Sequence, residues 1–368
     1  MKILYVSNVS NFSGIGGIEY HLIDIMDWFK KKGVTTGLAL RKNTFLHRNI
    51  LNDKPNVYPL YWTGFGKIYG FIQLAALIFR SDSDIISINR EHDIARTYFI
   101  TKFVSFFMKK KPKIVSVFHI AGCTVRFNLS KLDGMLFPSR FSMDSYVDKD
   151  TIYNKCVVVH HGVQLPVYQE DIKNDPDRER KFFAGKKFPV IGMVGELRKN
   201  QAELVDVAAE LNNMGIDFNI VIIGKGTASE IEQLEIIIKN KGLSDRVELV
   251  GHIDRTQIND VFFDLDIAVT TFRYDVFSVA NIESLASGTP LVAYRSGGTM
   301  EALENGGGVL VDGGPKEMAI ELKKLISDEQ LRKSMSIQAR KVAEKYYSID
   351  SMGTKHYEFY EKLFDGNK

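Results

Sequence analysis

The chain contains little cysteine and little net charge, and each absence excludes a class of protein. Only two of the 368 residues are cysteine, Cys123 and Cys156. This pair gives neither a disulfide framework nor the spacing of a metal site, so we expect buried thiols in a reducing cytoplasm. The formal net charge is +3. Bulk charge therefore gives no reason to expect a nucleic-acid partner.

Long apolar runs are also missing. A membrane-spanning helix needs about 20 apolar residues. The longest candidate, "GFIQLAALIF" at 70–79, is far shorter and contains a glutamine. The first residues, "MKILYVSNVS", lead directly into a strand pattern without the organisation of a signal peptide. We expect a soluble, cytoplasmic protein.

What the chain does contain is a regular alternation of short apolar runs with longer helical patterns. Runs such as "KILYVSNV", "DIISI" and "KIVSVFHI" occur in the first half, and "FPVIGMVGEL", "DFNIVIIGKG", "DIAVTTF" and "PLVAY" in the second. This rhythm predicts parallel sheets with helices on both faces. The charged, aperiodic segment 164–188 reads as an interdomain linker. We therefore predict two doubly wound α/β domains, 1–170 and 185–347, with a helix from about 348 to 368 packing back on the first.

Glycine-rich turns follow several of the predicted strands. Gly14, Gly16 and Gly17 lie between the first strand and the first helix, but Glu19 stands where the dinucleotide fingerprint needs its third glycine. A dehydrogenase is therefore disfavoured. The turn either is simply tight or leaves N–H groups free for an anionic ligand. Further glycines at 195, 224, 226, 297 and 298 also follow strands. Ligands bind at that edge of a parallel sheet, so the set favours a nucleotide or phosphate site.

One stretch, "RYDVFSVANIESLASGTPLVAYRSGG" (273–298), carries two carboxylates in an apolar setting. Asp275 lies in a loop, and Glu283 on a helix predicted from about Ser278 to Ser287, with Ser278 as N-cap and Gly288 after its end. A lone carboxylate among apolar residues is costly to bury. Glu283 is therefore either paired with a nearby Arg or Lys, or kept to accept hydrogen bonds from the hydroxyls of a ligand.

These residues resemble the E-x7-E segment of the retaining GT-B glycosyltransferases of family 4. Other segments that resemble the family follow in order along nearly the whole chain: "GGIEYH", "SVFHIAG", "HHGV", "GELRKNQAEL", "IIGKG", "SDRVELVGHI" and "GGTMEALENGGGVLV". The resemblance implies two Rossmann-like domains facing a central cleft. It also implies transfer of a hexose-type sugar from a UDP- or GDP-sugar to a glycan or lipid-linked acceptor in surface polysaccharide, O-antigen or glycolipid synthesis.

The resemblance also implies roles for particular residues. Glu283 would accept hydrogen bonds from the donor ribose, and Asp275 would bind the transferred sugar. Backbone N–H groups around Phe277, Ser278 and Val279 would face the sugar or diphosphate. The remaining implied residues are Arg198 and Lys199 at the departing diphosphate, His119 beside the sugar, Gly16 and Gly17 at the phosphates or acceptor, and Ile253 at the base.

Fixed cations and helix dipoles can stabilise a departing diphosphate without a metal. The resemblance accordingly implies no cofactor and no metal requirement. Three departures from the family pattern stand out: Asp275 for glutamate, Glu196 where arginine is common, and Ser278 for glycine. They indicate either an unusual donor sugar or reduced activity.

Several alternatives stay open. His119 is otherwise a hydrogen-bonded histidine at a strand end, and Arg198 and Lys199 are otherwise surface charges. "DLD" (264–266) and "DSD" (82–84) mimic a metal motif but precede strands, so we interpret them as turn residues. For the whole chain, the alternatives to a transferase are a non-catalytic glycosyltransferase-like subunit and a nucleotide-sugar epimerase of the same fold.

The segment "YFITKFVSFFMKKKPK" (98–113) interleaves aromatic and basic residues. One interpretation is a solvated helix end. The other is docking on an anionic membrane, which requires apolar anchors together with cations. Docking would suit a lipid-linked acceptor and would place the protein at the inner face of the membrane.

Overall fold

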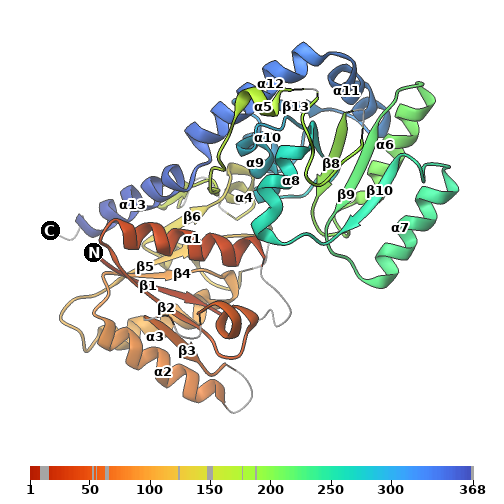
Figure 1. Cartoon of the computed structure of the whole chain (residues 1–368). Coiled ribbons are helices and arrows are strands. Elements are labelled where there is room, and N and C mark those ends of the chain that lie inside the picture. The colour runs from red at the N-terminus through yellow and green to blue at the C-terminus, as the bar shows by residue number, and fades with distance from the viewer. Residues whose placement is uncertain are drawn as a thin grey trace. The chain divides into compact units, whose positions relative to one another are not determined.

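The chain folds into two compact α/β units, shown in the computed structural model of Figure 1. The structure describes residues 1–8, 16–51, 54, 56–62, 66–122, 125–146, 152–175, 177–186 and 189–365. Unit 1 comprises Met1–Gly162 and Ile349–Lys368, and unit 2 comprises Val163–Ser348. The chain therefore leaves unit 1, completes unit 2, and returns.

Unit 1 is built on a parallel sheet in the order β3-β2-β1-β4-β5-β6-β7. Its strands are β1 (Lys2–Ser7), β2 (Thr35–Arg41), β3 (Val57–Leu60), β4 (Ile85–Ile88), β5 (Lys113–Val117), β6 (Gly134–Phe137) and β7 (Cys156–Val158). Its helices are α1 (Gly17–Lys31), α2 (Gly66–Ser81), α3 (Ile94–Ser105), α4 (Arg140–Asp144) and α13 (Ile349–Asp365), with short turns η1 (His47–Leu51), η2 (Glu91–Asp93), η3 (Leu129–Lys131) and η4 (Tyr153–Lys155).

Unit 2 is built on a parallel sheet in the order β10-β9-β8-β11-β12-β13. Its strands are β8 (Val190–Val194), β9 (Asn219–Ile223), β10 (Val247–Gly251), β11 (Ile267–Thr270), β12 (Leu291–Tyr294) and β13 (Gly308–Val311). Its helices are α5 (Glu170–Lys173), α6 (Gln201–Asn213), α7 (Ala228–Asn240), α8 (Ile258–Asp264), α9 (Val279–Ala286), α10 (Thr299–Ala302), α11 (Pro315–Ser327) and α12 (Glu329–Tyr346), with one short turn, η5 (Arg255–Gln257).

Both sheets are covered on both faces, because alternate residues of each strand point to opposite sides. In unit 1, Ile3 and Tyr5 pack with α1 and α13, whereas Leu4 and Val6 pack with α2 and α3. Unit 2 divides in the same way, with α6, α7 and α11 on one face and α8, α9 and α12 on the other. The near-continuous apolar strands that the sequence shows are therefore buried on two sides.

Two strands of unit 1 had no counterpart in the sequence pattern. They are β2, with seven residues, and β3, which has four residues and contains a proline at the edge of the sheet. The helix at the end of the chain, α13, packs on α1, where Trp28 Nε1 donates to Asp350 Oδ1 over 2.7 Å. A Cβ added at Gly353 would lie 2.2 Å from the Trp28 ring, so a glycine is needed for this close contact.

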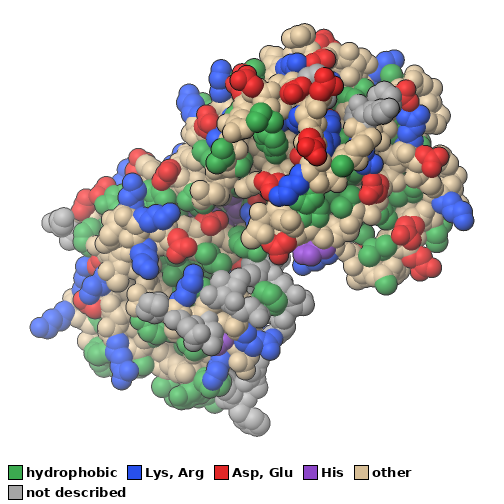
Figure 2. Space-filling view, in the orientation of Figure 1, with side chains coloured by type: hydrophobic (Ala, Val, Ile, Leu, Met, Phe, Trp, Pro, Cys, Tyr) green, Lys and Arg blue, Asp and Glu red, His purple; other side chains and the backbone are tan. Residues whose placement is uncertain are grey.

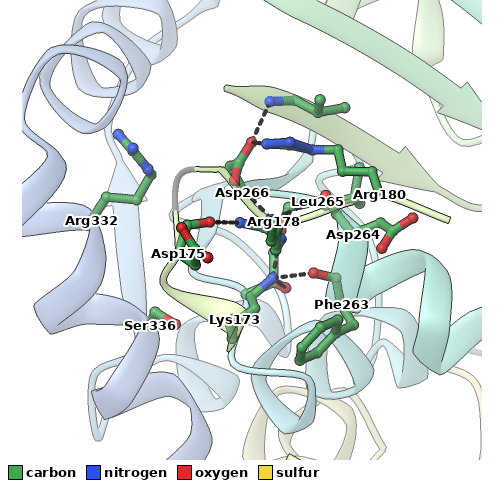
Figure 3. A network of polar contacts seen from close by, with 12 residues as sticks. Lys173, Asp175, Arg178, Arg180, Phe263, Asp264, Leu265, Asp266, Arg332 and Ser336 are labelled. Atoms are coloured by element: carbon green, nitrogen blue, oxygen red, sulfur yellow. Dashed lines mark hydrogen bonds and ion pairs between the residues drawn. The ribbon is translucent and has the colours of Figure 1, made fainter. Parts of the chain in front are cut away.

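The segment expected to be an interdomain linker is instead part of unit 2. The first unit boundary lies at 162/163 rather than in the predicted segment between 170 and 185, whereas the second, at 348/349, lies within one residue of the predicted position. The buried Lys173 ammonium donates to the backbone oxygens of Phe263 and Leu265, at 2.7 and 2.5 Å (Figure 3). These carbonyls at the end of α8 attract a cation.

Two arginines fasten the same segment. Arg178 and Arg180 each pair with Asp266, over 2.9 and 2.6 Å (Figure 3). Asp264 accepts from the Phe182 backbone N–H. The aspartates of "DLD" therefore anchor the chain, and the charged composition that suggested a linker comes from these buried ion pairs.

Two further expectations from the sequence concern membrane-spanning helices and the burial of the cysteines. In the described part of the chain, no helix combines the length and apolarity needed to cross a membrane. Cys156 is partly rather than fully buried, and burial raises the pKa of its thiol to about 11. Cys123 lies outside the described residues.

Candidate functional site

The centre of the candidate site in unit 2 is the loop between β11 and α9. Its backbone lies against the two glycines after β12: the Gly298 N–H donates to the Asp275 carbonyl over 2.8 Å. A Cβ added at Gly298 would lie 1.7 Å from the Val276 carbonyl oxygen, and one at Gly297 2.5 Å from that of Asp275. Only glycines permit this approach. The contact fixes the start of α9 and the direction of the Asp275 side chain.

Lys199 and Asp275 form an ion pair at this point, with 2.7 Å between Nζ and Oδ2. They meet because β8 and β11 are neighbours in the sheet, so the loops that follow them lie side by side. Asn200 has a left-handed backbone (φ 65°), and its carbonyl accepts from the Thr271 hydroxyl over 2.7 Å. The cation predicted at the diphosphate and the carboxylate predicted at the sugar are therefore in contact.

Arg198 does not join this pair. Its guanidinium is exposed and pairs with Glu196, with 2.6 Å between Nε and Oε2. Lys225 lies 3.7 Å from the same glutamate. Glu196, which departs from the family pattern, thus holds Arg198 as part of a surface charge cluster, the alternative considered from the sequence.

Glu283 lies on α9, and its side chain is only 5% exposed. It pairs with Arg255 of η5, whose side chain is 35% exposed. The ion pair considered for Glu283 from the sequence is therefore present. The sequence gave no indication that Arg255 is the partner, because η5 and α9 are brought together only by the fold. Because Arg255 reaches solvent, a ligand can approach the pair from its side.

The other predicted residues of unit 2 lie around this helix. Phe277 is buried and packs against Tyr347, with 5.6 Å between the two ring centroids. Only its backbone is therefore available to a ligand. Ser278 holds the N-cap position, as predicted, but its side chain makes no capping hydrogen bond. Val279 is the first residue of α9, and Ile253 packs half-buried on the core beneath.

His119 belongs to a group of four buried histidines in unit 1. The His21 ring centroid lies 5.3 Å from that of His119, 4.8 Å from His161 and 5.5 Å from His356. His119 follows β5; its Nε2 lies 3.3 Å from Asn89 Oδ1, and Glu91 accepts its backbone N–H. It is the hydrogen-bonded strand-end histidine considered from the sequence, and it is 4% exposed.

Burial determines the charge state of this histidine cluster. Desolvation lowers the pKa of His21 and of His119 well below the ordinary value, and it lowers the pKa of His356 to about 3. The neighbouring imidazoles act in the same direction, because a second positive charge would be repelled. Within the described residues, no three His, Cys, Asp or Glu side chains are arranged to hold a metal ion. Burial therefore favours the neutral form of His21, His119 and His356.

The glycine turn of unit 1 begins α1, with Gly16 as its N-cap. The Gly16 N–H donates to Glu19 Oε2 over 2.8 Å, and Glu19 Oε1 pairs with Arg90 over 2.5 Å. Gly16 and Gly17 are exposed, so a ligand can reach their backbone. Gly14 lies outside the described residues. Glu19, which breaks the dinucleotide fingerprint, caps the helix instead.

Comparison with known proteins relates the second half of the chain to a glycosyltransferase family. The sequence profile described as "Glycosyl transferases group 1" matches residues 174–342. The matched segment, which lies within unit 2, is similar to this glycosyltransferase family. It is similar to an alpha-D-kanosaminyltransferase of Streptomyces kanamyceticus (28% identity over 179 residues, 48% of this chain and 46% of the relative). It is also similar to a D-inositol 3-phosphate glycosyltransferase of Corynebacterium jeikeium (31% over 183 residues, 47% and 43%). The matches thus span about half the length of these curated relatives.

Solved structures resemble the chain over nearly its whole length. HepE of Anabaena in complex with UDP has a TM-score of 0.77 at 18% identity, covering 98% of this chain and 100% of its own. A glycosyltransferase from Rickettsia africae has a TM-score of 0.77 at 19% identity, covering 98% of each. At these identities the likeness concerns the fold, which is GT-B. The predicted pair of doubly wound domains and the predicted resemblance to glycosyltransferases are both confirmed.

Proposed function

We propose that the chain is a retaining glycosyltransferase that moves a hexose-type sugar from a UDP- or GDP-sugar to a glycan or lipid-linked acceptor. The observation that carries the proposal is the Lys199–Asp275 pair at the N-terminus of α9, next to Glu283 on the same helix. A cation and a helix N-terminus can bind the diphosphate of a nucleotide-sugar, and carboxylates can accept hydrogen bonds from its hydroxyls. Structures of HepE with UDP and with UDP-glucose favour a nucleotide-sugar donor.

In the proposed complex, the ligand exchanges partners with the two ion pairs. Ribose hydroxyls donate to Glu283 in place of part of the Arg255 contact, and sugar hydroxyls donate to Asp275. Lys199, released from Asp275, neutralises the diphosphate as the glycosyl–phosphate bond breaks. N–H groups at the start of α9 act on the same charge, so these residues supply the stabilisation without a metal.

A donor panel tests the proposal. Wild-type protein incubated with UDP- and GDP-sugars should release nucleoside diphosphate slowly in the absence of acceptor, and Glu283→Ala should abolish the release. Glu232→Ala, which removes the same charge from the exposed surface of α7, is the control and should keep full activity. Interconversion of sugars without release of diphosphate would indicate an epimerase, and no reaction or binding would indicate a non-catalytic subunit.

Two further measurements test the finer parts of the proposal. The anomeric configuration of the product, read by NMR during turnover, should match that of the donor. Activity should persist in EDTA, and an inverted product or a chelator-sensitive rate would overturn the corresponding part. The proposal also includes a pathway and a location. The enzyme would act in the synthesis of a surface polysaccharide, O-antigen or glycolipid, in the cytoplasm at a membrane surface.

A further inference from the structure

Two helices of unit 1 present large apolar side chains to solvent. On α2, Ile68 is 70% exposed, Ile72 60% and Phe79 53%. On α3 and the turn after it, the corresponding residues are Phe99 at 60%, Phe103 at 70% and Phe106 at 84% exposed. We call these six residues the α2–α3 face.

The face is a continuous surface rather than a set of scattered residues. The three residues of α2 recur at intervals of four and seven, and the three of α3 and its following turn at intervals of four and three, so each set forms a single stripe. The opposite sides of the same helices carry the buried residues Leu74, Ile78 and Val104, which pack on the sheet. The two helices pack on one another. Figure 2 shows hydrophobic side chains at the surface where Figure 1 places α2.

The charged residues within the two helices and the turn after α3 have one sign. Segments 66–81 and 94–112 contain seven Lys and Arg residues and no Asp or Glu. Lys102, Lys109 and Lys111 are exposed beside the three phenylalanines of α3. Lys110 is engaged with Asp84, and Arg96 with Asp93. An apolar stripe flanked by cations is complementary to a surface that is apolar inside and anionic at its boundary.

We propose that the α2–α3 face docks on an anionic lipid bilayer. The apolar side chains enter the boundary between headgroups and acyl chains, and the lysines lie at the lipid phosphates. Stable attachment of a peripheral protein takes two such signals together. A second copy of the chain fits this face poorly, because a symmetric contact would oppose cations to cations. The inference adds a membrane-binding surface to the proposed function. It rests on that function only in assuming that the acceptor is lipid-linked.

Vesicle sedimentation tests the inference with the full-length chain. The wild type should sediment with phosphatidylcholine vesicles that contain phosphatidylglycerol, and much less with pure phosphatidylcholine. The double variant Phe103→Ser/Phe106→Ser should lower the partition coefficient by about tenfold or more, because two buried anchors are removed. The triple variant Lys102→Gln/Lys109→Gln/Lys111→Gln should lower the partition coefficient about a hundredfold. Each lysine near an anionic surface contributes about 1 kcal/mol of binding free energy, and three such contributions correspond to about this factor.

Matched changes on unit 2 are the controls. Ile231→Ser/Ile236→Ser removes two exposed apolar residues of α7, and Lys239→Gln/Lys316→Gln/Lys323→Gln removes three exposed charges. Both should bind vesicles like the wild type. No sedimentation of the wild type, or equal losses in the controls, would overturn the inference. A wild-type dimer that the Phe103→Ser/Phe106→Ser variant dissociates, with vesicle binding unchanged, would assign the face to a second copy and overturn it as well.

Failure of this inference and failure of the proposed function are distinguishable. The face lies in unit 1, whereas the donor panel reports on residues of unit 2. Donor hydrolysis without vesicle binding would remove only the docking surface. Vesicle binding without any response to the donor panel would remove only the transferase.

Discussion

The two units share one architecture but differ in the groups that lie at the ends of their strands. Both sheets place the first strand centrally and add the next two on one side and the later ones on the other. In unit 2, the loops at the strand ends carry ion pairs, Lys199 with Asp275 and Arg255 with Glu283. In unit 1, Glu19 pairs with Arg90, and His119 lies in a cluster of buried imidazoles.

The difference separates groups that can exchange partners from groups that cannot. The cation of each pair in unit 2 is about a third exposed, so water or a ligand can replace it at modest cost. The four clustered histidines of unit 1 are almost completely buried, and any proton they take up must be buried with them. The ion pairs of unit 2 therefore suit a ligand that brings its own charge, whereas the histidine cluster of unit 1 does not.

The largest expected effect is on the pH dependence of unit 1. The folded pKa values of His21, His119 and His356 are lowered, so the unfolded chain binds protons that the folded chain does not. The contribution of the neutral histidines to the free energy of unfolding is therefore fully present above about pH 6.5. It is lost progressively as the pH falls below that value, and for His356 the loss continues to about pH 3. From pH 7.5 to 5.5 each histidine should cost about 1.4 kcal/mol, and the three together about 4 kcal/mol.

Urea unfolding followed by tryptophan fluorescence measures this, because both tryptophans, Trp28 and Trp62, lie in unit 1. His356→Leu should remove about a third of the pH dependence. His252→Gln, an exposed change in unit 2, should remove none. A pH-independent unfolding midpoint in the wild type would contradict a neutral cluster.

The next effect concerns the two adjacent cations of unit 2. Lys199→Met should lower the turnover number about 10²- to 10³-fold, the usual cost of removing a group that stabilises a developing anion. Arg198→Met is the matched control, because Arg198 is exposed and paired with Glu196. It should change the rate less than about fivefold. Steady-state rates with the preferred donor measure both, and equal losses would show that Arg198 reaches the diphosphate as well.

The smallest effect tests the exchange at Glu283. Arg255→Gln should lower the free energy of unfolding of the free protein by about 1 kcal/mol, because Glu283 is left without its cation. The nucleotide should then offset this loss, since ribose hydroxyls take over the carboxylate. Thermal unfolding with and without UDP or GDP should show a larger ligand-induced rise in Tm for the variant. A smaller rise would mean that Arg255 itself binds the donor.

The sequence predicts the elements whose signals are local. Buried parallel strands are apolar runs closed by glycines, which is why β8 to β13 and the start and end of α9 could be placed. β2 and β3 escaped because Thr, Gly, Arg and Pro interrupt their apolar pattern. The partners of Lys173 and Arg178 escaped for another reason: they lie more than 85 residues further along the chain.

The site shows the same division. The loop to α9 could be predicted from its glycines and carboxylates, because all of them lie within one stretch. The pairing of Arg255 with Glu283 depends on how η5 packs beside α9, which no local pattern reports. The histidine cluster draws on positions 21, 119, 161 and 356, and its last member arrives on α13 from the other end of the chain.

That position of α13 sets the order in which the protein can mature during its synthesis. Unit 2 lies wholly between the two crossings at 162/163 and 348/349, so all of it leaves the ribosome before unit 1 is complete. Until Ile349–Asp365 emerges, the α1 surface around Trp28 and the buried side of His21 have no cover. The domain made first is therefore finished last, and a nascent chain stalled before α13 would expose its apolar surface to chaperones or to aggregation.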